Sequence, residues 1–358
     1  MKKKFILFLF TVTFLFCLTS CGEKKETTAQ TESEAQTEET KKSETKKETE
    51  ETLAEGQMYS YLTGEPVDQA IGNKRPFAIM INNIEDAIPQ SGISQAEILY
   101  ECLVEYNITR LMCEFQDIEH LNKVGSVRSA RHYYMDLASD DSAIFTHFGQ
   151  SIFAEERIKN GYPTISGLSG YSESVFWRSD DRPAPHNVYT SKDGLNAGLS
   201  ATGISRDYPS GYEGRLNFFT SNTVPEKGDD ALKVTMPFEY NKPWFEYNED
   251  DGLYYRFQYG APHIDTENNE QLKFKNLIIQ YADRSVISEQ DHQDYTLIGK
   301  GTGLLITNGK AVKILWERPS EADVTKYYYE DGSPAYLNRG KSYISVVPSE
   351  TAVSCTAK

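Results

Sequence analysis

The chain has 358 residues and a formal net charge of −16, because 53 acidic residues outnumber 37 lysines and arginines. A body this acidic repels the phosphates of nucleic acid, so nucleic acid is excluded from the expected partners. The length suits a targeting segment followed by roughly two folded domains.

The N-terminus has the pattern of a secretion signal. Lys2, Lys3 and Lys4 precede an apolar run of 14 residues, 5–18, which is shorter than the roughly 20 residues of a membrane-spanning helix. The run ends in Leu18-Thr19-Ser20-Cys21-Gly22, which is similar to a bacterial lipobox. This pattern predicts that residues 1–20 are removed and that lipid on Cys21 anchors the protein to the outer face of the bacterial cell membrane. An ordinary secretory signal followed by a chance cysteine is the alternative.

Residues 21–57 form a predicted tether. Between Glu23 and Glu55 the sequence is almost wholly Glu, Lys, Thr, Ser, Gln and Ala, with 11 Glu, 6 Lys and no aromatic residue. Such a segment cannot bury enough apolar surface to offset the entropy lost on ordering, which predicts disorder. We expect it to hold a folded domain away from the membrane.

Residues 58–208 alternate between strand and helix patterns, which predicts an α/β domain. The expected elements are strands at 75–83 and 143–148, a hairpin with strands 98–105 and 110–115, and helices at 132–138, 152–159 and 191–199. The register of this hairpin, with its turn near residues 106–109, would place Cys102 opposite Cys113. A four-residue loop would make this the closer kind of cross-strand pair, within reach of a disulfide, and a two-residue loop would make it the wider kind. Two buried free thiols are the alternative, and the sequence leaves both open.

Residues 209–350 have a different pattern, with many short strands and no clear helix. The strands are expected at 231–238, 244–247, 253–259, 274–281, 295–306, 310–317, 326–329 and 343–347. Turn signals such as Asn308-Gly309 separate them. This predicts a β-rich barrel or sandwich-like domain, followed by a tail at residues 351–358. The fold class expected for the whole chain is therefore α+β.

Two polar stretches stand out in the first domain. The stretch 176–191 is stiffened by Pro183 and Pro185 and flanked by apolar residues, so it should be an extended loop with a fixed orientation. Its polar residues are Arg178, Asp180, Asp181, Arg182, His186 and Asn187. The second stretch, 125–131, contains Arg128 and Arg131. We expect the two loops to meet.

Four arginines in these loops suggest an anion site. The guanidinium group presents a planar fork to carboxylate or phosphate, so Arg128, Arg131, Arg178 and Arg182 would bind an anionic ligand together with Asn187. Pairing of the arginines with Asp180, Asp181, Glu173 or Asp136 is the structural alternative. His147 follows a buried strand and is a further ligand-binding candidate, unless it merely caps that strand.

His186 is the candidate general acid or base. It would need an orienting carboxylate, which Asp180 or Asp181 could supply. A histidine that hydrogen-bonds the loop backbone is the alternative. The sequence has no motif of a P-loop, a serine hydrolase or a zinc protease, and its histidines lack metal-ligand spacing, so we expect neither metal nor cofactor.

Several segments resemble the YerB-like bacterial lipoprotein family, whose two domains have no known function. They are Arg75-Pro76-Phe77-Ala78, Ile81-Asn82-Asn83, 96–101, Thr109-Arg110, 124–131, 182–187, Gly301-Thr302-Gly303 and 331–334. The family usually has proline at the position of Ser126 and glycines before Thr109. The resemblance implies a lipid-anchored envelope protein with two domains, and it implies no reaction.

The residues therefore support two functional hypotheses. The first is an extracytoplasmic lipoprotein that binds an anionic or glycan ligand of the cell envelope, or a partner protein, through the arginine-rich loops. The second is a hydrolase or transferase of the envelope polymer that uses His186. A purely structural module is the third possibility.

Overall fold

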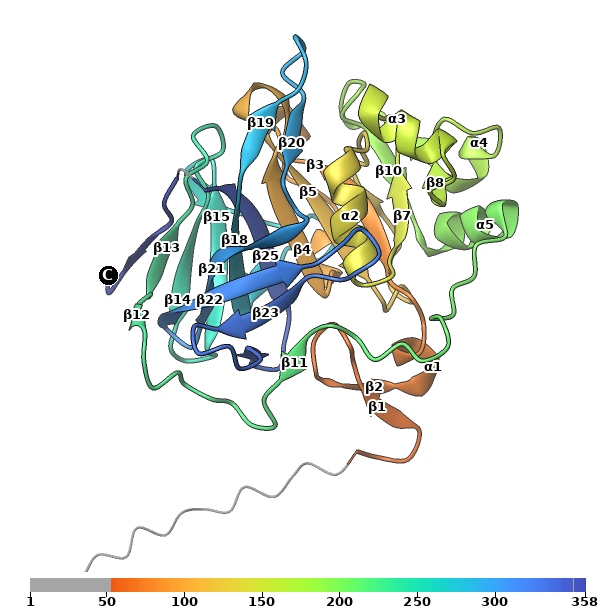
Figure 1. Ribbon diagram of the computed structural model, residues 1–358. Helices are drawn as coiled ribbons and strands as arrows, with labels where there is room; N and C mark the ends of the chain where they lie inside the picture. The colour runs from red at the N-terminus through yellow and green to blue at the C-terminus, as the bar shows by residue number, and fades with distance from the viewer. Residues whose placement is uncertain (1–52, 350) are drawn as a thin grey trace, which may run out of the picture. The chain divides into compact units, whose positions relative to one another are not determined.

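The computed structural model describes residues 53–349 and 351–358, and its main feature is one sheet of 11 strands (Figure 1). In order across the sheet, its strands are β12 (Asp229–Asp230), β22 (Lys310–Arg318), β21 (Gly299–Thr307), β18 (Asn276–Ala282), β25 (Ser342–Pro348), β4 (Ile98–Leu103), β5 (Thr109–Phe115), β3 (Phe77–Asn82), β7 (Ile144–His147) and β8 (Thr164–Ser166), with β23 (Lys326–Tyr329) beside β22. The signal peptide, Cys21 and most of the predicted tether lie outside the described residues.

A parallel pairing of β25 with β4 joins the two halves of the chain within this sheet. The register runs from Ser342 opposite Ile98 to Val346 opposite Cys102. Strands that the sequence assigned to separate domains are therefore continuous in one sheet.

A second sheet packs on one face of the large one. Its strands are β16 (Ala261–Pro262), β15 (Leu253–Gln258), β14 (Trp244–Asn248), β13 (Lys233–Thr235) and β26 (Ser354–Thr356), with β17 (Lys273–Phe274) paired to β15. The ring of Phe245 lies 4.7 Å from that of Tyr343, centroid to centroid, so the two sheets share a core. Among the described residues no sheet closes into a barrel, and the sandwich-like form of the expected α+β fold is confirmed. Residues 354–356 pair with β13 rather than fraying as a tail.

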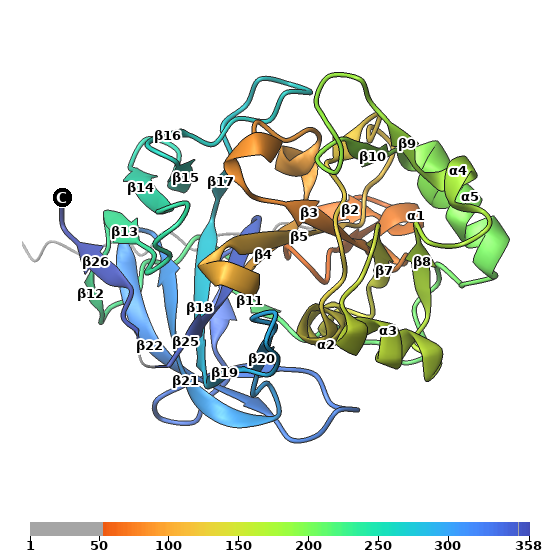
Figure 2. The same ribbon diagram turned by 90° about the horizontal axis from the view of Figure 1, so that it is seen from above.

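Helices cover the large sheet on both faces (Figure 2). Along β3, residues 77, 79 and 81 point into the core shared with the second sheet, and residues 78 and 80 point toward the other face, because side chains alternate along a strand. The helices α2 (His132–Asp140) and α3 (Ile152–Lys159) pack on that other face. The helices α4 (Ser172–Val175) and α5 (Lys192–Thr202) lie on the first face.

Side chains fix where these helices begin. Ser151 Oγ accepts a hydrogen bond from Ala154 N at 3.2 Å, and Ser191 caps α5 in the same way. The other elements are short: β1 (Gln57–Tyr59), β2 (Pro66–Asp68), α1 (Gln69–Gly72), β6 (Val124–Gly125), β9 (Trp177–Arg178), β10 (Val188–Thr190), β11 (Asn217–Phe218), β19 (Arg284–Val286), β20 (Gln293–Tyr295), β24 (Tyr336–Leu337), and the 3-10 turns η1 (Glu85–Ala87), η2 (Ile93–Gln95) and η3 (Glu105–Asn107).

The β4–β5 hairpin has a register that differs from the expected one. Cys102 lies opposite Arg110, and Cys113 lies opposite Leu99. The two thiols are free and buried, and they belong to the cores on opposite faces of the sheet. The predicted register, with Cys102 opposite Cys113, was therefore wrong, because the turn is built differently from the expected one. Of the two alternatives left open for the cysteines, the structure has the two buried free thiols.

A buried ion pair connects the large sheet to the second sheet. The carboxylate of Glu101 on β4 accepts from Arg256 Nη2 on β15 at 2.7 Å, and both side chains are fully buried. Asn83, Thr109, Asn241 and Tyr343 donate further hydrogen bonds to this carboxylate. Each Glu101 oxygen is thus satisfied, which is the condition under which a buried charge is tolerated. In the described part of the chain, no helix has the length and apolarity needed to cross a membrane.

Candidate functional site

The two polar loops meet where β3 ends. β6 and β10 pair in antiparallel fashion, and Val127 N donates to Val188 O at 2.7 Å. The loop 125–131 is also held to β3, because Asn82 N donates to Ser126 O. Residues about 60 positions apart in the sequence are thereby fixed side by side.

Two glycines lie where loop 125–131 packs closely against its neighbours: Gly125 faces the second polar loop, and Gly149 follows β7. A Cβ on Gly125 would lie 2.7 Å from Val188 O, and a Cβ on Gly149 would lie 2.6 Å from Ser129 Oγ. Both residues also have positive φ values, which L side chains rarely adopt. A larger residue at Gly125 would collide with the backbone of the second loop, whereas at Gly149 it would collide with the Ser129 side chain of the first.

Three arginines gather around a single carboxylate beside these loops. Arg131 binds both oxygens of Glu105 through Nε and Nη2. Arg110 is buried at the start of β5 and donates from Nη1 to Ser129 O at 2.9 Å, while its Nε has no partner among the described residues. Burial, and then the charge of Arg131, lower the pKa of Arg110 to about 9.

Arg128 has no counter-ion among the residues that the structure describes. Its guanidinium is half-buried, and it makes no hydrogen bond or ion pair with any residue that the structure describes. Burial, then the charges of Arg131 and, more weakly, Arg178, lower the pKa of Arg128. Three guanidinium groups thus share one carboxylate, Glu105, which leaves an excess of positive charge.

The second loop adds Arg178 and His186. Arg178 Nη1 donates to Asn187 Oδ1 at 2.8 Å, and its guanidinium lies 5.2 Å from the centre of the Phe148 ring. Asn187 in turn donates to Ser179 O at 2.9 Å, so it orients Arg178. Arg182 points elsewhere and donates to Pro89 O. We name Arg110, Arg128, Arg131, Arg178 and His186 the arginine site.

His186 is not oriented by an aspartate. Asn82 Nδ2 donates to His186 Nδ1 at 2.8 Å, which leaves Nε2 to carry the proton of the neutral ring. Asp181 instead pairs with Lys123 at 3.0 Å, and Asp180 is exposed without a contact among the described residues. Burial, and then the charge of Arg128, lower the pKa of His186. The expected His186–aspartate pair was therefore wrong, because Lys123 attracts Asp181.

His147 lies near these loops but inside the core. Its side chain is fully buried, and Nδ1 donates to Gly149 O at 2.6 Å. Burial lowers the pKa of His147 to about 4, so the ring is neutral. This position supports the structural alternative, in which His147 braces the turn after β7.

Sequence reasoning missed two members of this arrangement, Arg110 and Asn82. Arg110 was not among the predicted site residues, although the Thr109-Arg110 segment was among those that carried the family resemblance. Asn82 lies 104 residues from His186 in the sequence, and no local pattern indicates that contact.

A hollow opens beside the arginine site. Its volume is about 600 Å³, and its walls include Phe148, Arg178, Trp177, Ser169, Ser172 and Glu173. Arg178 belongs to both the hollow and the arginine site. Trp177 is 39% exposed and Leu168, in the neighbouring turn, is 60% exposed.

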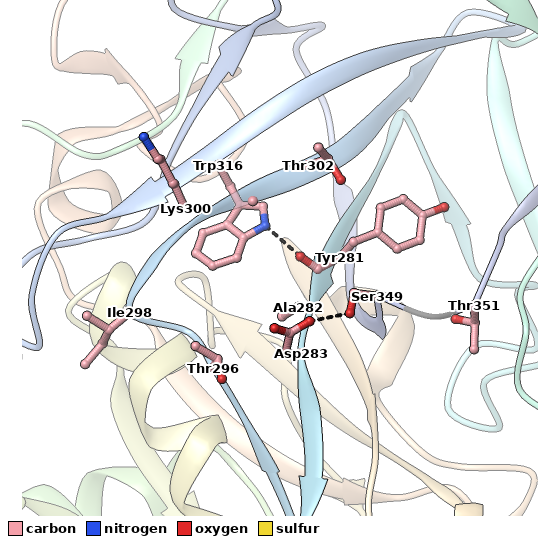
Figure 3. Close-up of a pocket in the computed structure, with 11 residues that line it drawn as sticks. Tyr281, Ala282, Asp283, Thr296, Ile298, Lys300, Thr302, Trp316, Ser349 and Thr351 are labelled. Carbon is pink, nitrogen blue, oxygen red and sulfur yellow. Dashed lines mark hydrogen bonds between the residues drawn. The ribbon is translucent and has the colours of Figure 1, made fainter. Parts of the chain in front are cut away.

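Another hollow lies on the second half of the chain and is lined by Trp316, Asp283 and Lys300 (Figure 3). Its volume is about 440 Å³, and Asp283 accepts a hydrogen bond from Ser349. Thr296 and Ile298 also line an adjoining hollow, in which His132 is paired with Asp294 and Arg157 with Asp136. Most charges there have partners, in contrast to Arg128. Within the described ranges no cluster of His, Cys, Asp and Glu could hold a metal ion.

Comparison with known proteins gives a consistent result. Residues 62–205 match the family described as "Protein of unknown function (DUF3048) N-terminal domain", and residues 234–344 match its C-terminal domain. The chain is 31% identical to "Putative lipoprotein YerB" of Bacillus subtilis (strain 168), over 82% of this chain and 87% of that protein. The crystal structure of YerB from Bacillus subtilis superposes with a TM-score of 0.74 at 29% identity, over 84% of this chain and 99% of that one. These matches confirm the resemblance that the sequence segments indicated.

Proposed function

The chain belongs to the DUF3048 family, and from that premise we propose that it is a lipid-anchored envelope protein that binds an anionic ligand at the arginine site. The relative in Bacillus subtilis is named as a lipoprotein, which supports an association with the membrane. The lipobox-like sequence around Cys21 supports the anchor, and the acidic tether supports a position at some distance from the lipid surface.

The unpaired guanidinium of Arg128 carries this proposal. Removing a charged group from water is costly, so partly buried arginines are normally paired with a carboxylate. Arg128 instead lies next to other cations, an arrangement that costs stability in the absence of a ligand. A bound carboxylate or phosphate would supply the missing negative charge, since the guanidinium fork fits the planar geometry of either group.

The neighbours of Arg128 suit the same role. Arg178 is held by Asn187, and the neutral ring of His186 retains an Nε2–H that can donate to an anion. Donors fixed in advance bind an anion with little further loss of entropy. The loops therefore offer a preorganised set of donors rather than a flexible charged surface.

Calorimetric titration of the full mature chain with inorganic phosphate and with acetate tests the proposal. We expect saturable binding of at least one anion, and at least a tenfold loss of affinity in Arg128→Gln. The matched control is Lys313→Gln, which removes an exposed cation on β22, with five strands of the sheet between β22 and β3. Equal binding by both variants, or no heat with either anion, would remove the proposal.

The alternative function, a hydrolase or transferase that uses His186, has less support. The ring is oriented by Asn82, an amide that does not stabilise a charged imidazolium as a carboxylate would. Asp181 is engaged with Lys123.

A further inference from the structure

We propose that the hollow beside the arginine site is a sugar subsite, so that the ligand is an acidic saccharide rather than a free anion. This inference rests on the proposed function. It is carried by one juxtaposition. Phe148 and Arg178 both form walls of the hollow, and the Arg178 guanidinium lies 5.2 Å from the centre of the Phe148 ring. Phe148 N also donates to Arg128 O at 3.1 Å, which places Arg128 next to the same wall. A ligand in the hollow would therefore place a negative group directly at the cations.

The walls of the hollow have the chemistry that binds sugar rings. Phe148 and the exposed part of Trp177 offer aromatic surface to the C–H groups of a ring. Ser169 and Glu173 offer a hydroxyl and a carboxylate, and neither side chain has a partner among the described residues. A volume of about 600 Å³ is within the usual range for small-ligand sites, roughly 300–1,000 Å³.

The charge pattern indicates where each part of the ligand binds. Glu173 would repel an anion but accept hydrogen bonds from sugar hydroxyls, so the neutral ring belongs in the hollow. The guanidinium groups of Arg178 and Arg128 then receive the acidic substituent, either a carboxylate on the ring or a phosphate ester. A ring carboxylate and a phosphate ester would bind the arginines in the same way, and the probes glucuronate and glucose 6-phosphate distinguish between them.

An anionic membrane surface is the competing occupant, because exposed Leu168 and Trp177 lie near cations on a lipid-anchored protein. Two observations favour the saccharide. The aromatic surface lines a hollow rather than a protruding edge, and the Glu173 carboxylate in its wall would be repelled by anionic headgroups.

The test compares five probes on the full mature chain: glucose, glucose 6-phosphate, glucuronate, inorganic phosphate, and vesicles of phosphatidylglycerol. We expect glucose 6-phosphate or glucuronate to bind at least tenfold more tightly than phosphate. Trp177→Ala should remove this advantage and leave phosphate affinity unchanged, whereas Arg128→Gln should weaken every anion. The control is Tyr240→Ala, which truncates another exposed aromatic residue, outside the hollow.

The outcomes separate the two proposals. If sugar acids bind no better than phosphate, the sugar subsite is refuted and the anion site stands. If phosphate, glucuronate and the sugar phosphate all fail to bind, both proposals fail. Binding to vesicles alone, lost in Trp177→Ala, would replace the sugar subsite with a membrane contact. As a control, thermal unfolding of each variant measures whether the substitution has left the fold intact.

Discussion

Arg128→Gln should weaken ligand binding and yet leave the fold unharmed or slightly stabilised. The substitution breaks no side-chain hydrogen bond with a described residue, and it removes the repulsion of Arg128 by Arg131 and Arg178. At an effective dielectric constant of about 20, two like charges repel by roughly 4 kcal/mol at about 4 Å and by less at larger separations. Partial exposure and salt reduce this value, and Glu105 offsets part of it. We therefore expect the free energy of unfolding to rise by about 0.5–1 kcal/mol at low ionic strength.

Urea unfolding of the ligand-free protein at low and high salt measures this change. The gain should shrink as salt rises, because it is electrostatic. Arg131→Gln is the contrasting variant. It breaks the paired contact with Glu105 and should lose about 3 kcal/mol or more. A loss of more than about 1 kcal/mol in Arg128→Gln would mean that Arg128 supports the loops, and the reasoning behind the site would be wrong.

Three further predictions concern the rest of the molecule. Glu101→Gln should lower the free energy of unfolding by about 3–5 kcal/mol, because Arg256 is left buried without a counter-charge. The control Glu246→Gln removes one partner of a surface ion pair and should change the free energy of unfolding by less than about 1 kcal/mol. Equal effects of the two substitutions in urea titrations would contradict this expectation. Burial raises the pKa of Glu114 well above its usual value, so the titration of Glu114 by itself lowers the stability of the wild type as pH rises from about 4.5. Glu114→Gln lacks this contribution, so the difference in the free energy of unfolding between wild type and variant should change with pH. Parallel pH profiles of the two proteins would refute the expectation. Cys21→Ala should move the protein from the membrane fraction to the soluble fraction after cell lysis, and retention with the membrane would argue against the anchor.

Local patterns in the sequence predicted most of the elements. The helix expected at 152–159 is present as α3 with the same bounds, because Ser151 caps it and Asn160-Gly161 ends it. The strand expected at 326–329 is likewise β23. Caps and turn residues act within a few positions, so they can be recognised without knowledge of the tertiary structure.

The hairpin register could not be predicted in the same way. The turn between β4 and β5 contains Tyr106 and Asn107, both at positive φ, and Val104 N donates to Ile108 O across it. These features lengthen the loop to residues 104–108. The resulting odd shift of the register puts Cys102 and Cys113 on opposite faces, because side chains alternate along a strand.

Contacts between distant segments were also beyond prediction from the sequence. β25 and β4 are both buried, apolar strands that pair in parallel. An apolar pattern predicts a buried strand, but it does not indicate which other strand will pair with it. The same holds for Asn82 and His186. The meeting of the two polar loops was predictable only in outline, from their shared arginine content. Which residues of the two loops contact each other depends on the tertiary structure and could not be predicted from the sequence.

The most direct test of the arginine site is a crystal of the full mature chain soaked in tungstate, an oxyanion whose metal atom gives a strong anomalous signal. We expect a peak within hydrogen-bond distance of both the Arg128 and Arg178 guanidinium groups, and we expect it to disappear in Arg128→Gln. A saturating soak that leaves this position empty, or an Arg128 already paired with a carboxylate of its own chain, would contradict this expectation.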